Sequence, residues 1–69
     1  MGDVLRRLRE AKGLTQTELA KRAKITDEYV SMLESGAKRN PSFEVLKRLA
    51  KALGISVGEL LVLVEKSEE

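Results

Sequence analysis

Two short segments of helical character, separated by only three residues, constrain this chain more than any other feature of its sequence. In the segments 16–23 and 27–35 the apolar residues recur at helical spacing, and only Lys24, Ile25 and Thr26 lie between them. Two helices of about eight residues joined by so short a link cannot lie side by side along their length. The sequence therefore predicts two short helices that cross at a steep angle.

The ends of these two helices are marked by residues that satisfy unpaired backbone groups. Thr15 and Glu18 have the spacing of a capping box at the start of the first helix. Thr26 is the expected N-cap of the second helix, and Gly36 follows it where a left-handed backbone favours glycine.

Three further helices are expected, at about 3–12, 43–53 and 57–64, and no segment alternates as a half-buried strand would. The fold class is therefore all-α, with five helices in one domain over residues 1–64, followed by a polar tail, 65–69. We expect the helix 43–53 to bury Phe43, Leu46, Leu49, Ala50 and Leu53.

The composition excludes several classes of function. The chain has no Cys and no His, which removes disulfides, thiol nucleophiles and the commonest metal ligands. No nucleophile with a neighbouring base and no phosphate-cradling glycine loop is visible, so we expect no enzyme, no cofactor and no small-molecule ligand. The longest apolar run, 60–64, is far shorter than the roughly 20 residues that span a bilayer. We therefore expect a cytoplasmic protein with no membrane contact.

Positive charge is concentrated in the first four fifths of the chain. Residues 1–54 contain 12 Lys and Arg against 7 Asp and Glu, whereas residues 55–69 contain 1 against 4. Such a distribution favours a polyanionic partner for the first part of the chain.

The segment from Gln16 to Ser35 resembles the helix-turn-helix of the Cro and phage-repressor family, also called the XRE family. The matching positions are Gln16, Leu19, Ala20, Ile25, Thr26, Val30, Leu33, Glu34 and Gly36. Flanking stretches, 8–9, 13–16, 40–42 and 49–54, match as well, so the resemblance covers nearly the whole chain. It implies a compact five-helix bundle of the lambda-repressor-like type, with the helix-turn-helix formed by the second and third helices.

The resemblance also implies sequence-specific binding of double-stranded DNA by a small transcriptional regulator, a repressor or controller, with helix 27–35 in the major groove. The residues expected to contact bases are Thr26, Asp27, Glu28, Ser31 and Met32. Those expected to contact phosphates are Arg9, Gln16, Tyr29, Lys38, Arg39 and Asn40. Arg9 is also expected to pair with Glu34, and the ring of Tyr29 has the alternative of packing on a neighbouring helix.

Asp27 and Glu28 depart from the family pattern, which commonly has Arg, Gln, Ser or Lys at these positions. Two readings remain open: the carboxylates accept hydrogen bonds from cytosine, or the surface has turned toward a protein partner. Met32 is ambiguous in the same way. The alternative function is thus a protein-interaction module or coactivator that does not read DNA sequence. Lys24 also stands where the family usually has glycine. If its φ is positive, the lysine costs the fold about 1 kcal/mol of stability.

The last predicted helix carries more apolar surface than a short terminal helix needs. We expect its residues Leu60, Leu61, Leu63 and Val64 to form a homodimer seam, although part of this run has the alternative of closing the monomer core. A two-fold dimer would read a palindromic operator on the nucleoid.

Overall fold

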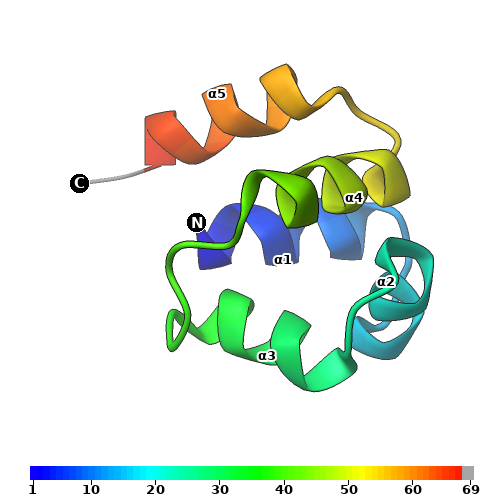
Figure 1. Cartoon of the computed structure of the whole chain (residues 1–69). Coiled ribbons are helices and arrows are strands. Elements are labelled where there is room, and N and C mark those ends of the chain that lie inside the picture. Colours follow the sequence, from blue (N-terminus) through cyan, green and yellow to red (C-terminus); the bar gives the residue numbers. More distant parts are fainter. Residues whose placement is uncertain (68–69) are drawn as a thin grey trace.

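The computed structural model describes residues 1–67, which form five helices and no strand (Figure 1). The helices are α1 (Gly2–Ala11), α2 (Gln16–Ala23), α3 (Asp27–Ser35), α4 (Phe43–Leu53) and α5 (Val57–Ser67). The all-α prediction is confirmed, and the predicted bounds of α2, α3 and α4 agree with the structure. The predicted α1 was shifted by one residue. The predicted end of α5 at Val64 was wrong, since the helix continues to Ser67; the rest of the predicted tail, 68–69, lies outside the described residues.

The start of α2 is fixed by the predicted capping box. The Thr15 hydroxyl accepts from the Glu18 backbone N–H at 3.0 Å, and the Glu18 carboxylate accepts from the Thr15 backbone N–H at 2.9 Å. This second bond, with the Thr15 hydroxyl next in effect, lowers the pKa of Glu18 below its ordinary value. The cap therefore stabilises the fold above the ordinary pKa of Glu, and its contribution is lost as the pH falls through the lowered pKa.

The crossing of α2 and α3 is packed by residues that the sequence placed on their inward faces. Leu19 and Ala20 of α2 and Val30 and Leu33 of α3 are all buried, and they belong to one core cluster with Leu49, Ala50 and Leu53 of α4. A small residue at position 20 allows the two helices to approach closely. In Figure 1, α2 lies at the right-hand end of the molecule, beside the start of α3 and the end of α4, and it packs against both helices.

Phe43 does not join this core, so that prediction was wrong. Its side chain is 57% exposed, whereas Leu46 is half-buried and Leu49 is fully buried. Burial increases along α4 from Phe43 at its first position to Leu49. The Lys47 ammonium lies 5.8 Å from the centre of the Phe43 ring, within the range of a cation–π contact.

Leu60 was predicted to lie in a dimer seam, and the structure corrects this. It is completely buried in the monomer core, where α5 packs against α4 and α1. The alternative that part of the apolar run closes the monomer core is correct for this residue. Leu61 and Val62, one and two positions further, are 39% and 49% exposed, and Leu63 is half-buried. Val64 is half-buried and packs against the core cluster.

A buried ion pair joins α1 to α3. The Arg9 guanidinium donates from Nε to Glu34 Oε2 at 2.7 Å and from Nη2 to Oε1 at 3.1 Å, and Nη1 donates to the Leu14 carbonyl at 2.8 Å. Only 12% of the Arg9 side chain and 4% of that of Glu34 are exposed. The hydrogen bond to Glu34 raises the pKa of Arg9 despite its desolvation. The predicted pairing is confirmed, and it also fixes the chain at Leu14 before α2.

Gly2 is required where α1 begins. A Cβ at this position would collide with the backbone carbonyl of Glu34, because the first turn of α1 lies directly against the end of α3. The ion pair and this backbone approach together hold the two helices in one arrangement.

Lys24 has the left-handed backbone that the sequence suggested, with φ 60° and ψ 43°. It is the only non-glycine residue with positive φ among residues 1–67, and glycine occupies the three other such positions. A side chain in this conformation costs on the order of 1 kcal/mol relative to glycine.

Replacing Glu34 with Gln should lower the free energy of unfolding by about 2–4 kcal/mol, because the nearly buried Arg9 guanidinium would lose its countercharge. Urea denaturation measures this loss. The matched control is Asp3→Asn, which removes a carboxylate from the exposed Asp3–Arg6 pair and should change stability by less than about 0.5 kcal/mol. Equal losses in the two variants would show that burial of the pair is not the cause.

Replacing Lys24 with Gly should raise the free energy of unfolding by about 0.5–1 kcal/mol and the Tm by about 2–8 °C, because glycine adopts the left-handed backbone without strain. Lys24→Ala is the control, since it removes the charge and keeps the Cβ. An equal gain in the Ala variant would assign the effect to charge instead of backbone conformation.

Candidate nucleic-acid interface

The outward face of α3 presents the five residues predicted to contact bases. Thr26, Asp27, Glu28 and Ser31 are exposed and Met32 is half-buried, all within the N-cap and the first two turns of the helix. The Thr26 hydroxyl accepts from the Tyr29 backbone N–H at 3.0 Å, so it caps the helix and keeps its own proton available for donation. The structure brings these five side chains together, and their contact with bases stays a prediction.

Asp27 is held by a residue that the sequence analysis missed. The Thr17 hydroxyl, in the first turn of α2, donates to Asp27 Oδ2 at 3.3 Å. This bond crosses from one helix of the pair to the other and leaves Oδ1 of Asp27 without a hydrogen bond within residues 1–67. The signal available in the sequence was that both residues lie in the first turn of short helices that must cross.

Gln16 is the first residue of α2, and its side chain is hydrogen-bonded to the buried ion pair. Its Nε2 donates to Glu34 Oε1 at 3.1 Å, so Glu34 accepts from both Arg9 and Gln16. The amide keeps a second N–H, and the first-turn backbone N–H groups of α2 have no acceptor within the helix. A phosphate at this point would meet donors that are already fixed in position, and this role of Gln16 stays a prediction.

Arg9 has little surface left for a phosphate. Three of its five N–H groups are donated inside the protein, to Glu34 and to the Leu14 carbonyl. A direct contact between Arg9 and a phosphate stays a prediction. Only the two remaining N–H groups of Arg9 are available for it. The principal effect of Arg9 on an interface is to position Glu34 and, through it, Gln16.

The loop after α3 presents the remaining polar candidates. Lys38, Arg39 and Asn40 are all exposed, and the Lys38 backbone N–H donates to the Met32 carbonyl at 3.1 Å, which anchors the loop to α3. Tyr29 is half-buried and packs against the core cluster, which agrees with the alternative that its ring packs inside the protein. Phosphate contacts from the Tyr29 hydroxyl and from the loop stay predictions.

The exposed face of α3, the start of α2 and the loop 38–40 suit contact with the surface of another macromolecule. Across the described residues, no group of three or more His, Cys, Asp or Glu side chains gathers as a metal site would. None of the helices within residues 1–67 is long and apolar enough to cross a membrane. What the structure does assemble is an exposed helix face, a fixed helix start and a basic loop, which are the parts that a helix-turn-helix protein uses on DNA.

Comparisons with known proteins agree with this geometry. The model of the helix-turn-helix family matches residues 5–60. The chain is 46% identical to the uncharacterized HTH-type transcriptional regulator y4dJ of Sinorhizobium fredii over 88% of its length and 78% of that protein. It is also 46% identical to the HTH-type transcriptional regulator DdrOP3 of Deinococcus deserti, over 88% of this chain but only 46% of the relative.

A solved structure of the Bacillus subtilis regulator SinR in complex with DNA superposes with a TM-score of 0.82 at 33% identity, over 87% of this chain and 95% of that one. The lambda-repressor-like fold and the relatives are those of DNA-binding regulators and not of enzymes. The chain therefore belongs to the helix-turn-helix family of DNA-binding transcriptional regulators, of the Cro and phage-repressor type.

Proposed function

We propose that this protein is a repressor or controller that binds an operator in double-stranded DNA, on the nucleoid in the cytoplasm, with α3 in the major groove. The observation that carries this proposal is the exposed face of α3, on which Thr26, Ser31 and Met32 flank two carboxylates. An α-helix with its side chains is about 10–12 Å across, which fits a major groove about 12 Å wide.

The phosphate grip is proposed from two elements beside this helix. Gln16, whose amide donates to Glu34 in the last turn of α3, and the free N–H groups of the α2 start form one part, and Lys38 and Arg39 of the loop anchored to Met32 form the other. Neutral donors at a helix start orient the protein on the backbone, whereas the loop cations add affinity by releasing counterions.

The two carboxylates at the start of α3 are proposed to select bases. Asp27 is held at Oδ2 by Thr17, and Oδ1 accepts no hydrogen bond from the described residues, so it is available to a base. A carboxylate oxygen accepts from the N4 amine of cytosine and repels the acceptor edges of guanine. Asp27 and Glu28 would therefore lower affinity for DNA in general and raise discrimination between sites.

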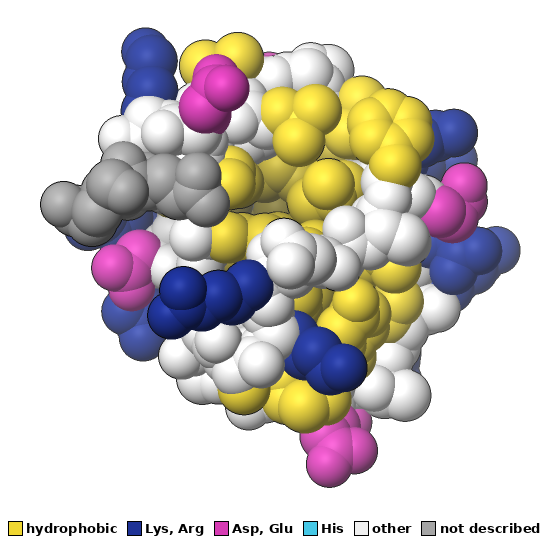
Figure 2. All heavy atoms as spheres, turned by 60° about the vertical axis from the view of Figure 1, so that its left-hand side comes forward, with side chains coloured by type: hydrophobic (Ala, Val, Ile, Leu, Met, Phe, Trp, Pro, Cys, Tyr) yellow, Lys and Arg dark blue, Asp and Glu magenta, His cyan; other side chains and the backbone are white. Residues whose placement is uncertain are grey.

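Dimerisation is proposed through the exposed part of α5. With Leu60 assigned to the core, the seam consists of Leu61, Leu63 and Val64, now joined by the exposed Val62. Figure 2 shows hydrophobic side chains exposed between charged ones on this side of the molecule. A two-fold pair would place two copies of α3 about 34 Å apart, so selection from random DNA should recover a palindrome.

The double variant Lys38→Ala/Arg39→Ala should bind every duplex more weakly, with the slope of log K against log salt reduced by about 2. Fluorescence anisotropy of a randomised duplex pool at several salt concentrations measures both quantities. Lys47→Ala/Lys66→Ala removes the same charge from outward positions on α4 and α5 and should leave the slope within error of the unmodified protein. An unchanged slope in the loop variant would remove the proposed clamp.

Asp27→Ala should abolish a cytosine preference at one position of each half-site, worth about 1–3 kcal/mol of discrimination. Selection and sequencing of the bound DNA, for the unmodified protein and the variant, measures it. Glu28→Ala makes the same change of charge and should alter the base preference at a different position. If both variants only bind all duplexes more tightly, the carboxylates do not read bases, and the protein-interaction alternative gains support.

A further inference from the structure

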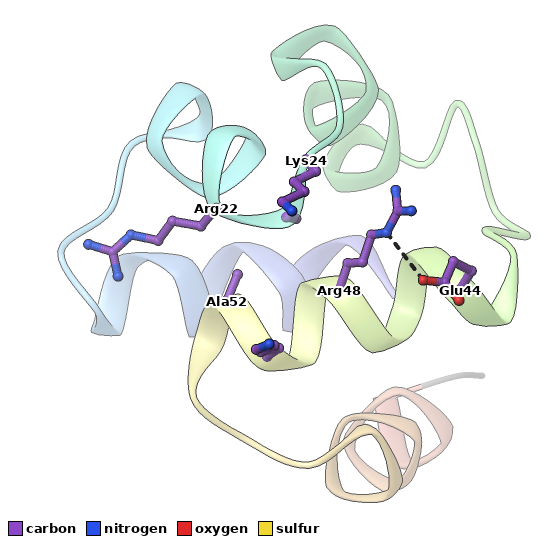
Figure 3. A pocket seen from close by; sticks show the side chains of 7 residues that line it. Arg22, Lys24, Glu44, Arg48 and Ala52 are labelled. Carbon is purple, nitrogen blue, oxygen red and sulfur yellow. Dashed lines mark ion pairs between the residues drawn. The ribbon is translucent and has the colours of Figure 1, made fainter.

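A hollow with an excess of positive charge lies between the end of α2 and the side of α4 (Figure 3). Its volume is about 550 Å³, and four of its lining side chains are cationic. Arg22 and Lys24 come from α2 and the turn, and Arg48 and Lys51 come from α4. We name this feature the cationic hollow.

One carboxylate, that of Glu44, lines the cationic hollow and offsets only part of this charge. Glu44 Oε2 lies 3.3 Å from Arg48 Nε, four residues along α4. Arg22, Lys24 and Lys51 form no ion pair with any described residue. Cations held around one depression repel one another and attract an anionic group from solution.

Lys24 places a positive charge in the hollow at a backbone position that favours glycine. The other three helix ends or turns with positive φ within residues 1–67 carry glycine, and this one carries a strained lysine whose side chain lines the hollow. A residue held in this conformation persists only where the surrounding structure over-determines it, and such residues cluster at ligand clamps and other functional sites.

The cationic hollow lies away from the proposed DNA-binding face. α2 packs against both α3 and α4, and the hollow is on the α4 side (Figure 3). None of the residues that line it belongs to α3 or to the loop 38–40, which carry the proposed base and loop contacts. DNA bound through those residues would therefore not use the side chains of the hollow.

The chemistry of the hollow fits an acidic protein segment better than a phosphate. Its cations are distributed along two elements, and in Figure 3 the Arg22 side chain points away from Lys24 and Arg48, so they suit carboxylates spaced along a chain better than one compact phosphate. Ala23 and Ala52 add small apolar surface between the charges. We propose that the cationic hollow docks an acidic, extended segment of a partner protein, which gives this regulator a contact separate from DNA.

Two variants of equal charge test the proposal. Arg22→Ala/Lys51→Ala removes two cations from the hollow, and Lys38→Ala/Arg39→Ala removes two from the loop after α3. Each is titrated by fluorescence anisotropy, at one low salt concentration, with a labelled synthetic peptide in which Asp and Glu alternate with Ala, and separately with the randomised duplex pool.

The hollow variant should bind the peptide about tenfold more weakly and DNA within about twofold of the unmodified protein, and the loop variant should show the reverse. As a check that needs no variant, adding the peptide to isotope-labelled unmodified protein should shift the amide resonances of 22–24 and 48–52.

Equal loss of peptide binding in the two variants, or resonance shifts spread over all basic surfaces, would overturn the proposal as charge attraction without a site. A hollow variant that loses DNA affinity and keeps peptide affinity would assign the hollow to the DNA backbone. Failure of the unmodified protein to bind any duplex would contradict the proposed function and leave the peptide result to stand by itself.

Discussion

The buried ion pair of Arg9 and Glu34 is the interaction on which the rest of the structure depends. It joins α1 to α3 in a domain too small to rely on a large core, and it also fixes the chain before α2 through the Leu14 carbonyl. Because the Gln16 amide donates to the same carboxylate, the start of α2 is fixed relative to the end of α3. One carboxylate thereby links the stability of the fold to the geometry of the proposed DNA interface.

The acidic start of α3 is consistent with this rigid frame. Two carboxylates at a helix N-terminus are favoured by the helix dipole, so Asp27 and Glu28 stabilise α3. The same two charges would weaken the binding of α3 to DNA phosphates. The Thr17 bond restricts the Asp27 side chain. On the proposed DNA-binding face, a carboxylate held in this way would oppose general DNA binding and contribute to discrimination between bases.

Local signals predicted most of the fold. The Thr15, Thr26 and Gly36 caps fixed α2 and α3 to the residue because each cap satisfies backbone groups of one helix only. The apolar run in α5 was harder: five consecutive apolar residues do not indicate which one faces the core, and Leu60 faces it. Phe43 was misplaced for a related reason, since helical spacing gives a face but not how far a neighbouring helix covers it.

The candidate site was less predictable because its contacts join residues that lie far apart in the sequence. The Arg9–Glu34 pair was expected from the family, but the bonds of Gln16 to Glu34 and of Thr17 to Asp27 depend on the crossing angle of α2 and α3. The cationic hollow likewise exists only where the end of α2 meets α4.

The central position of α2 explains how so small a domain presents two separate charged surfaces. This helix packs on α3, and its first residues lie at the proposed phosphate site. It also packs on α4, and its last turn and the residue after it supply two cations of the hollow, Arg22 and Lys24. The two surfaces share a rigid element but no side chain. Occupying one would therefore leave the contacts of the other intact, so a partner could bind the hollow of a DNA-bound protein without competing for the operator.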